Sequence, residues 1–557
     1  MMKKKTPFAV ILAVVLLLAA GFAGVKLAVK YMPSFEFVDL RERYGAKGDT
    51  VAILLNDELQ KAQGIFEEGQ TYLPLSWVNE QLNEKFFWDE NEKLLVYTLP
   101  EEIVYATEQT KGSNGSPLIK VKGDQVYLAL GLVSGYTDIR IRPFDLDASL
   151  IRRIYIDTRW EEEEMAVLSR KGKVRELGGI KSPIVTEAAK GSRVRVIDRM
   201  DQWSEIMTED GYIGYIQNRL LKEDGTDYPK STFIQPVYRS IAMEEKVVLL
   251  FHQVTSQEGN GTLEERIANT KGVNVIAPTW FALMDNEGNY QSWASKEYVD
   301  RAHELGLQVW AVLDNFNYNG GKDVNTQILL GTTSNRKKLI AKLMEDADAY
   351  GFDGINLDFE TLREAAGKYY VQFIRELSVS CRKKGLVLSV DNYVPAAYNM
   401  FYNRAEQGRV VDYVIVMGYD EHFAGGEMGS VASIEFVKNG IADTLKEVPK
   451  EKVINAIPFY TRVWTEGDNG TTSSALGIKA AAEWVEKNQV ELIWQEELGQ
   501  YYGELFTDEG KKSVWMEETN SITLKMNAIE EYGLAGVACW KAGFEPKEIW
   551  DVVNLNE

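Results

Sequence analysis

The nine residues Phe352-Asp353-Gly354-Ile355-Asn356-Leu357-Asp358-Phe359-Glu360 alternate apolar and polar side chains. Successive side chains on a β-strand point to opposite faces, so the amide of Asn356 and the carboxylates of Asp358 and Glu360 share one face. An edge strand could leave these acids in water, whereas a buried strand needs a polar cleft beside them. Helical patterns at residues 336–350 and 365–384 flank the stretch and favour burial on both faces. We therefore expect this strand to line a polar cleft.

Strand and helix patterns continue to alternate from about residue 244 to the end of the chain. Eight apolar segments predict strands, and helical patterns or longer excursions separate them, which predicts a (β/α)₈ TIM barrel over residues 244–557. The interval of about 459–520 is too long for a loop and predicts an inserted α+β subdomain after the seventh strand. The predicted strands are residues 247–251, 273–278, 307–313, 354–359, 386–390, 411–417, 452–458 and 535–540, and the predicted helices are residues 296–305, 336–350, 365–384, 434–447, 523–532 and 546–553.

A barrel of this kind carries its functional side chains at the C-terminal ends of the strands. Acids, tyrosines, an arginine and tryptophans occupy these ends. Aromatic faces can stack on sugar rings and carboxylates can transfer protons, so their convergence on one mouth predicts a carbohydrate cleft. The residues at or near the strand ends are His252, Trp280, Asn315, Asp358, Glu360, Met417, Tyr419, Asp420, Pro458, Tyr460, Arg462, Trp464 and Trp540.

Four of these segments resemble the motifs of glycoside hydrolase family 18. Residues 353–360 resemble its D-G-x-D-x-D-x-E signature, and residues 416–420 (V-M-G-Y-D) resemble its M-x-Y-D motif. Residues 457–462 (I-P-F-Y-T-R) resemble its P-x-Y-G-R motif, and Trp540 matches the tryptophan that ends its eighth strand. Because four motifs occur in order on the matching strands, the resemblance is specific and covers roughly residues 244–557.

The resemblance implies hydrolysis of N-acetylglucosaminyl linkages with retained configuration, in which the acetamido group of the substrate acts as the nucleophile. Glu360 would be the general acid and later the base, and Asp358 would orient the acetamido group and stabilise its charge. Tyr419 would hydrogen-bond the same group, Trp540 would form the floor beneath the sugar, and Asp420 and Arg462 would hold its hydroxyl groups. The predicted substrate-binding set is Asn356, Met417, Asp420, Arg462, Trp540, Trp280 and Tyr460.

Two positions depart from the motifs. Asn356 stands where the signature has an aspartate, as in the spore-cortex and related bacterial branches that this sequence resembles, and Thr461 stands where the strand-seven motif has glycine. An amide cannot share a proton with Asp358, so we expect Asn356 to donate a hydrogen bond that keeps Asp358 ionised. The presence of Glu360 argues against an inactive relative.

Composition limits the other possibilities. The 557 residues carry 62 basic and 83 acidic side chains, a formal net charge of −21, which argues against nucleic acid as a partner. The three histidines and two cysteines are far apart in sequence and lack the spacing of metal ligands. We therefore expect no metal site, no cofactor, and two buried free thiols at Cys381 and Cys539.

Residues 1–30 carry a targeting signal. Lys3, Lys4 and Lys5 precede an uninterrupted apolar run over residues 7–25, which is long enough to span a bilayer. The lysines predict a cytoplasmic N-terminus and place the rest of the chain outside the cell membrane. The alternative is a signal peptide that is cleaved near Gly21 and Ala23, which would release a secreted protein.

Two small β-rich domains are expected before the barrel. Residues 34–160 contain Y-L-P-L-S-W-V and F-F-W-D-E-N-E-K-L-L-V-Y, which resemble the small domain named after the N-terminus of copper amine oxidases, although no copper ligands are present. Residues 165–225 resemble a bacterial Src-homology-3-like barrel, after a glutamate run at residues 161–164 that predicts a solvated linker. Trp203, Tyr212 and Tyr215 could line a ligand groove or fill the small core.

Substrate follows from this chemistry and location. An exported enzyme beside a domain of a wall-binding type would meet peptidoglycan before chitin, so we expect a polysaccharide with N-acetylglucosamine, in the cell wall or spore cortex. Chitin-type oligosaccharides are the second possibility, and a catalytically silent glycan-binding protein on the same barrel is the third.

Overall fold

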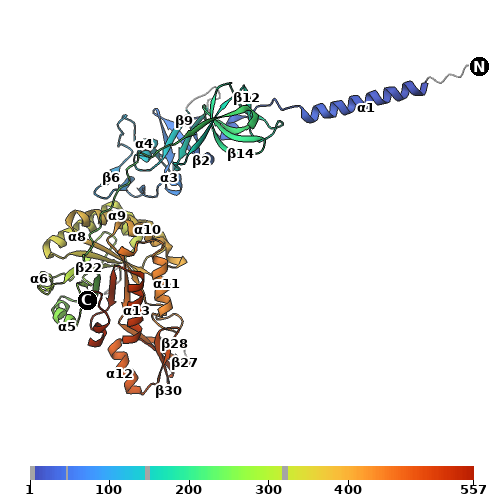
Figure 1. The fold of residues 1–557 in the computed structure, drawn as a ribbon. Helices are drawn as coiled ribbons and strands as arrows, with labels where there is room; N and C mark the ends of the chain where they lie inside the picture. The colour runs from blue at the N-terminus through green and yellow to red at the C-terminus, as the bar shows by residue number, and fades with distance from the viewer. Residues whose placement is uncertain (1–6, 46–47, 145–150, 317–323, 469, 557) are drawn as a thin grey trace, which may run out of the picture. The chain divides into compact units, whose positions relative to one another are not determined.

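The computed structural model describes residues 7–45, 48–144, 151–316, 324–468 and 470–556, and its chain divides into two compact units (Figure 1). One unit comprises Met1–Phe86 with Ala106–Gln235, and the other comprises Phe87–Tyr105 with Pro236–Glu557. The second unit holds the barrel, which is described first.

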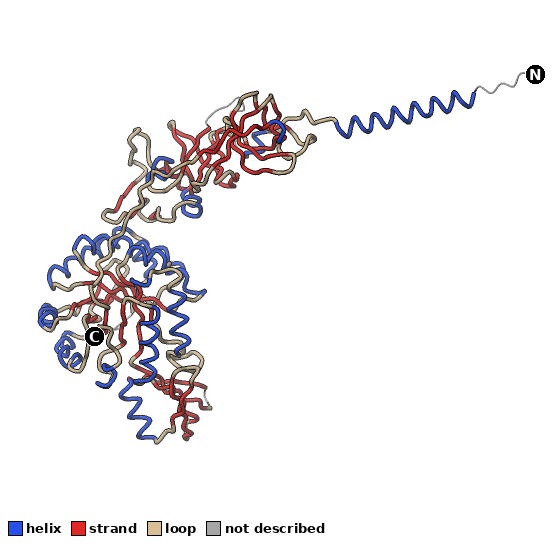
Figure 2. Tube along the Cα trace, in the orientation of Figure 1, coloured by secondary structure: helices blue, strands red, loops and turns tan. Residues whose placement is uncertain are grey.

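Eight parallel strands close into a barrel, as the alternation of strand and helix patterns predicts. Each strand pairs with the next along the chain, and the last, β32, pairs with the first, β18, so the ring has no open edge. Figure 2 shows these strands surrounded by helices. The barrel strands are β18 (Val247–His252), β19 (Val275–Pro278), β22 (Gln308–Asp314), β23 (Gly354–Asp358), β24 (Val387–Tyr393), β25 (Tyr413–Met417), β26 (Val453–Pro458) and β32 (Gly536–Trp540).

The helices between the strands largely match the predicted ones. α8 and α9 each end at a glycine with a left-handed backbone, Gly351 at φ 79° and Gly385 at φ 72°, which stops the helix and turns the chain into the next strand. The segment predicted as a last helix at residues 546–553 is instead a short 3₁₀ turn, Lys547–Asp551. The helices of the barrel are α5 (Leu263–Ile267), α6 (Lys296–Glu304), α7 (Thr326–Gly331), α8 (Thr333–Tyr350), α9 (Glu364–Lys384), α10 (Arg404–Val410), α11 (Ile434–Thr444) and α13 (Thr519–Tyr532).

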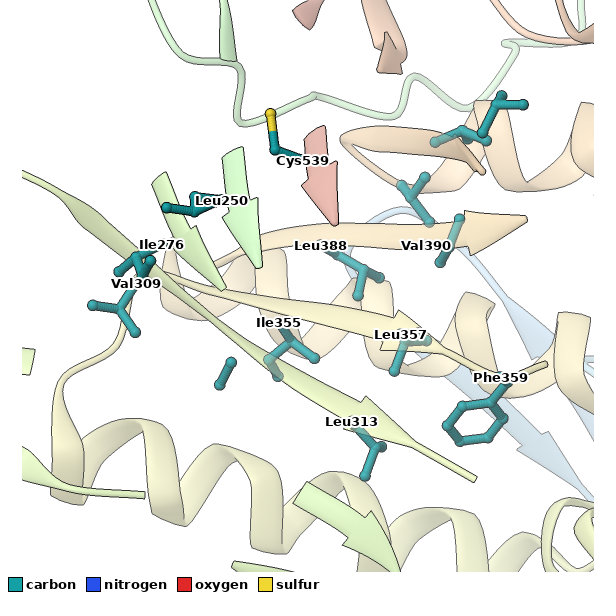
Figure 3. Packing of buried hydrophobic residues seen from close by; sticks show 14 of the residues in the cluster. Leu250, Ile276, Val309, Leu313, Ile355, Leu357, Phe359, Leu388, Val390 and Cys539 are labelled. Atoms are coloured by element: carbon teal, nitrogen blue, oxygen red, sulfur yellow. The ribbon is translucent and has the colours of Figure 1, made fainter. Parts of the chain in front are cut away.

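Two apolar clusters hold the barrel together, and the apolar side chains of β23 belong to the first of them. Ile355, Leu357 and Phe359 are fully buried in the layer between strands and helices, and Figure 3 shows them in succession along the strand. A second cluster, which includes Phe251 and Trp310, fills the barrel interior. The first residue of β23, Gly354, must be a glycine, because a Cβ there would lie 2.8 Å from the indole of Trp310. The alternation of β23 therefore turns its apolar side outward and its polar side into the barrel.

The predicted insertion after the seventh strand is present. Its five strands form an antiparallel sheet in the order β28-β27-β31-β30-β29, and α12 (Ile478–Asn488) lies alongside β27 and β28 (Figure 1). The strands are β27 (Tyr460–Gly467), β28 (Gly470–Gly477), β29 (Leu492–Gln495), β30 (Gln500–Thr507) and β31 (Gly510–Met516). A further hairpin, β20 (Phe281–Leu283) and β21 (Tyr290–Ser292), extends from β22.

Residues 87–105 lie inside the predicted domain of residues 34–160, and they group with the barrel unit. It forms a three-stranded sheet of β4 (Phe87–Asp89), β5 (Leu94–Thr98) and β6 (Ile103–Ala106). The fully buried carboxylate of Asp89 accepts hydrogen bonds from the backbone N–H of Thr333 at 2.5 Å and from its hydroxyl at 2.6 Å. Asp89 thus caps the first turn of α8 from a segment 244 residues earlier.

The first unit contains the apolar N-terminal helix and a seven-stranded sheet. Helix α1 (Pro7–Tyr31) has 25 residues, about 37 Å at about 1.5 Å per residue, and is apolar enough to cross a membrane. Near an N-terminus, a signal sequence has the same properties, and Lys3, Lys4 and Lys5 lie outside the described residues. The remaining helices are α2 (Leu40–Tyr44), α3 (Leu75–Gln81) and α4 (Leu130–Gly135), and the strands are β1 (Thr50–Leu55), β2 (Glu58–Glu67), β3 (Gln70–Pro74), β7 (Ile119–Lys122), β8 (Gln125–Ala129), β9 (Arg140–Phe144) and β10 (Arg152–Asp157).

A second seven-stranded antiparallel sheet follows, where the Src-homology-3-like barrel is predicted. Its first strand already begins at Glu163, whose carboxylate pairs with Arg140 at 2.5 Å, so the glutamate run is not a fully solvated linker. Tyr212 is buried in an apolar cluster, whereas Trp203 and Tyr215 are half-buried. The strands are β11 (Glu163–Leu168), β12 (Gly172–Arg175), β13 (Ile184–Ala188), β14 (Arg193–Arg199), β15 (Trp203–Thr208), β16 (Ile213–Gln217) and β17 (Leu221–Asp227).

Candidate active site

Two acids stand at the C-terminal end of β23. Asp358 is its last residue and is 6% exposed, and Glu360 follows two positions later, half-buried at the barrel mouth. Within the described residues, Oδ1 of Asp358 has no hydrogen-bond partner. A buried carboxylate oxygen without a donor is costly, so this atom is placed to bind something that enters the mouth.

Glu360 is held by groups from two neighbouring strands. The hydroxyl of Tyr393, on β24, donates to Glu360 Oε2 at 2.5 Å. Asn315, just after β22, accepts a hydrogen bond from the backbone N–H of Thr361 at 3.3 Å and its carbonyl accepts from the Thr361 hydroxyl at 3.2 Å. The side chain and the backbone after it are therefore both fixed, as a positioned proton donor requires.

Carboxyl groups from three adjacent strands stand at one level of the barrel. Asp314 on β22 is paired directly with Asp358, and Asp391 follows the pair of Leu357 with Val390 on the other side. Asp314 is 2% exposed and Asp391 is 4% exposed. With Glu360 just above, the mouth of the barrel concentrates four acids in a poorly solvated space.

Burial and mutual repulsion favour the protonated forms of these acids. Burial raises the pKa of Asp358 well above its ordinary value, and the nearby charges of Glu360, Asp391 and Asp314 raise it further. Burial also raises the pKa of Glu360, against the hydrogen bond from Tyr393, which lowers it. Burial raises the pKa of Asp314 to about 7. A raised pKa at Glu360 suits a general acid near neutral pH.

The segment after β25 brings a tyrosine and a further acid to the same mouth. Met417 ends the strand, 5% exposed, and Gly418 follows because a Cβ there would lie 2.8 Å from the carbonyl oxygen of Ala456. Burial raises the pKa of Tyr419 well above its ordinary value, so its hydroxyl stays protonated and can donate. Asp420 has a left-handed backbone, φ 59°, an uncommon conformation that fixes the direction of its carboxylate.

The seventh and eighth strands complete the mouth. The hydroxyl of Tyr460 donates to Asp420 Oδ1 at 2.5 Å, and its ring meets that of Tyr419 edge-on with 6.0 Å between centroids. Arg462, on β27, donates to the Ser473 hydroxyl at 3.0 Å. Burial raises the pKa of Tyr460, and the positive charge of Arg462 lowers it. Trp540 ends β32 and packs edge-on against Phe251, with centroids 5.4 Å apart, which leaves it half-buried above the interior cluster.

Two predicted residues lie elsewhere. Trp280 is fully buried between strands and helices, where its indole N–H donates to Asn260 Oδ1 at 2.8 Å, so the structure does not bring it to the mouth. Asn356 is also fully buried, and its amide donates to Asp391 Oδ1 at 2.8 Å and to the Ser389 hydroxyl at 3.0 Å. These bonds correct the expectation that Asn356 donates to Asp358.

Sequence reasoning missed Asp314, Asp391 and Tyr393. Each lies at the C-terminal end of a barrel strand, where the same rule that selected Glu360 could have found it. Asp391 directly follows the fifth predicted strand, and Ser389, Asp391 and Tyr393 alternate with apolar or amide residues. Within the residues that the structure describes, no group of three or more His, Cys, Asp or Glu side chains is arranged to hold a metal ion.

Comparison with known families shows which protein family this barrel belongs to. The sequence profile of glycosyl hydrolases family 18 matches residues 251–545, more than half of the chain. The chain belongs to glycosyl hydrolases family 18. The strand-four signature of this glycosidase family, with Asp358 and Glu360, lies inside the matched segment. A second profile, the bacterial dipeptidyl-peptidase Sh3 domain, matches residues 178–221, within the predicted Src-homology-3-like barrel.

Family 18 relatives include proteins named for glycan cleavage. The uncharacterized glycosylase YvbX of Bacillus subtilis is 28% identical over 294 residues, 51% of this chain and 84% of that protein. The cortical fragment-lytic enzyme of Bacillus subtilis is 27% identical over 249 residues, 43% of this chain and 58% of that protein. The match thus spans little more than half the length of the cortex-lytic relative.

Solved structures share the fold of the family 18 barrel. The chitinase of Chromobacterium violaceum aligns with a TM-score of 0.50 at 22% identity, over 55% of this chain and 98% of that one. The spore cortex-lytic enzyme SleL of Bacillus cereus aligns with a TM-score of 0.50 at 19% identity, over 59% of this chain and 78% of that one. At these identities the likeness concerns the fold alone.

Proposed function

We propose that this protein hydrolyses N-acetylglucosaminyl linkages of peptidoglycan or spore cortex by substrate-assisted, retaining catalysis. The observation that carries the proposal is the arrangement at the end of β23: a half-buried Glu360 fixed by Tyr393, beside a buried Asp358 with one oxygen free of partners among the described residues. Glu360 can hold a proton for the leaving group, and Asp358 can face the acetamido group of the sugar.

The reaction begins with protonation of the glycosidic oxygen. Glu360 gives its proton to that oxygen as the bond from it to the anomeric carbon breaks, and the acetamido carbonyl oxygen of the same sugar bonds to the anomeric carbon from the other face. Asp358 stabilises the positive charge that develops on the acetamido nitrogen, and the Tyr419 hydroxyl donates to the acetamido oxygen and orients it. Ionised Glu360 then takes a proton from water, which attacks the anomeric carbon and restores the acetamido group.

Four side chains form the sugar site in this proposal. Trp540 provides an apolar floor for the ring that carries the acetamido group. Asp420, oriented by Tyr460, and Arg462 bind sugar hydroxyl groups through charge-assisted hydrogen bonds. Met417 closes the apolar side of the pocket.

Peptidoglycan is favoured as substrate by the rest of the chain. The bacterial dipeptidyl-peptidase Sh3 domain matches residues 178–221, in the module whose resemblance suggests binding of cell-wall peptides, and one relative is named as a cortical fragment-lytic enzyme. Chitin-type oligosaccharides carry the same acetamido group and are the competing substrate. We propose the domain limits of residues 34–160, without residues 87–105, and 165–225 for the two β-rich modules.

The direct test counts reducing ends released from purified peptidoglycan and, in parallel, from chitin oligosaccharides. We expect release from peptidoglycan by the wild-type chain and a loss of a hundredfold or more, roughly, in Glu360→Gln. Glu345→Gln, a matched change at an exposed position of α8, serves as the control and should keep the wild-type rate. Equal rates in wild type and Glu360→Gln, or glycan binding without turnover, would refute the enzymatic proposal. Release from chitin alone would refute the substrate.

We also propose that α1 remains as a membrane anchor, with the β-rich modules and the barrel outside the cell. Its apolar length exceeds the ~30 Å hydrocarbon core of a bilayer. Membrane fractions should therefore hold the protein after an alkaline wash, and the N-terminal peptide of that protein should still contain residues 7–31. A mature chain that begins after residue 23 and appears in the medium would instead establish a cleaved signal peptide.

A further inference from the structure

Below the catalytic acids, a buried pair joins β23 to β24. The amide of Asn356 donates to Asp391 Oδ1 at 2.8 Å, and Asn356 is fully buried while Asp391 is 4% exposed. The same amide nitrogen donates to the Ser389 hydroxyl at 3.0 Å. The amide of Asn356 is therefore directed across to the next strand and away from the Asp358 side chain on its own strand.

This pair lies where the family signature has a second aspartate. Residue 356 is that position, and its amide cannot hold an exchangeable proton between two carboxylates. Asp391 supplies a carboxyl group within hydrogen-bond distance of the same position, from the neighbouring strand. The carboxyl group that the signature has at residue 356 is thus supplied by Asp391 on the neighbouring strand.

Asp391 also lies close to Asp358. Leu357 and Val390 are direct partners in the parallel sheet, so Asp358 and Asp391, the next residues, stand side by side on strands about 4.8 Å apart. The two groups interact electrostatically, since the charge of Asp391 raises the pKa of Asp358. The two carboxyl groups are therefore close enough to compete for one proton.

Among the residues that the structure describes, no cation offsets this concentration of acids. Within the described residues, no Lys, Arg or His side chain forms an ion pair with Asp314, Asp358, Glu360 or Asp391. Like charges in a poorly solvated space cannot all be ionised, so the group of acids retains a proton near neutral pH. The titratable and polar groups that interact with Asp391 are Asn356, Asp358 and Glu360 from β23 and its end, Tyr370 from α9 and Tyr419 from the end of β25. Asp314 from β22 adjoins Asp358, Tyr393 from β24 donates to Glu360, and Ser389 from β24 accepts from Asn356.

We propose that Asp391 is a positioning residue that shares a proton with Asp358, in the role that the aspartate at position 356 has in the family signature. The inference rests on the proposed function, because it assigns the proton that Asp358 must gain and release during substrate-assisted catalysis. Asn356 would hold Asp391 in place and stabilise its ionised form.

The proton is conserved through the cycle. As positive charge develops on the acetamido nitrogen, the O–H bond of Asp358 breaks and an O–H bond forms on Asp391, which leaves Asp358 ionised beside the charge. When water has opened the intermediate and the acetamido group is neutral again, the proton returns to Asp358. Asp391 touches no substrate atom and acts only through Asp358.

Transfer of the carboxyl group between the two strands tests this directly. The full-length chain would be prepared as wild type, Asp391→Asn, Asn356→Asp/Asp391→Asn, and Ser389→Ala. The last is a matched control, because it removes the other hydrogen bond of Asn356 without a change in the number of carboxyl groups. Initial rates of reducing-end release from peptidoglycan would be measured against pH, with melting temperatures for all four proteins.

We expect Asp391→Asn to lose about tenfold or more in rate and to move its pH optimum downward by about half a unit or more, since a neighbouring negative charge has been removed. The double variant should regain most of the rate and the wild-type optimum, whereas Ser389→Ala should keep both. A wild-type profile in Asp391→Asn, or a folded double variant no more active than Asp391→Asn, would overturn the inference while wild-type turnover leaves the proposed function intact. If Asp391→Asn does not fold, the double variant decides alone: folded and active supports the inference, and folded and inactive overturns it. An inactive wild-type chain would overturn both.

Discussion

The two ends of β23 carry acids in opposite conditions. At the start of the strand, Asp353 is half-exposed, and its Oδ2 accepts hydrogen bonds from the Val309 N–H and the His303 ring, both at 2.8 Å. At the other end, Asp358 is almost fully buried, one of its oxygens has no described partner, and its nearest charges are other acids. A satisfied acid at the closed end of a barrel stabilises the fold, whereas an unsatisfied one at the open end is available for chemistry.

Among single changes at the two ends of β23, Asp358→Asn should have the largest effect on activity. The amide cannot hold the charge that stabilises the acetamido group, so we expect a loss of roughly a hundredfold or more in the rate of peptidoglycan hydrolysis. Stability should stay equal or rise, because a buried, mutually repelling carboxyl group is removed. Rates and melting temperatures of the purified chain check both parts. A clear fall in melting temperature would mean that Asp358 is a structural residue.

The complementary change, Asp353→Ala, should show the opposite pattern. Removal of the acceptor leaves the Val309 N–H unpaired between β22 and β23, at a cost of about 1–3 kcal/mol in the free energy of unfolding. Chemical denaturation would measure this loss. Activity at a temperature where the variant is folded should stay within about twofold of wild type, because no substrate contact changes. A hundredfold loss of activity in folded protein would erase the distinction between the two ends.

Asp89→Ala removes a second acid whose hydrogen bonds are satisfied, one that comes from a distant part of the sequence. The acceptor for the first N–H of α8 is lost, so we expect about 1–2 kcal/mol lower stability of the barrel unit and unchanged turnover. Glu92→Ala is the matched control, since Glu92 is exposed and its carboxylate accepts longer hydrogen bonds, 3.2 and 3.3 Å, from the next N–H of the helix. Equal melting temperatures for the two variants would contradict the role of Asp89 as the cap.

The smallest expected effect is a shift of the pH profile in Tyr393→Phe. The hydrogen bond from Tyr393 lowers the pKa of Glu360, so its removal should raise that pKa. Glu360 must be protonated to act as an acid, and the alkaline limb of the rate profile should therefore move to higher pH. Tyr402→Phe loses a hydroxyl that donates to the Phe359 carbonyl and should leave that limb in place. A shift to lower pH in Tyr393→Phe would mean that the bond stabilises the protonated acid.

Much of this site could be predicted from local sequence, because the faces and the ends of single strands are visible in short segments. The alternation of apolar and polar residues from Ile355 to Glu360 specifies both faces of one strand, and the strand-end rule selects Tyr419, Asp420 and Trp540 without knowledge of the packing. The same rule applied to the fifth strand would have found Asp391.

The parts that could not be predicted depend on distant contacts. The local sequence predicts only that Asp89 lies beside the turn of a hairpin. Its role as a helix cap depends on Thr333, which follows 244 residues later. Trp280 follows a strand as the predicted residues do, but its indole finds Asn260 as a partner and turns into the core. The partner of Asn356 was misassigned for the same reason, since Asp391 comes from another strand.

In the proposed reaction Glu360 works with the acetamido group of the substrate, and no second protein carboxylate activates the attacking water. Asp314, Asp391 and Asp420 lie near enough to make an inverting, two-carboxylate reaction a real alternative. Proton NMR of the new reducing end, recorded within the first minutes of hydrolysis of a β-linked N-acetylglucosamine glycan, separates the two. We expect the β-anomer to appear first and the α-anomer to follow by mutarotation. An initial α-anomer would contradict the proposed reaction.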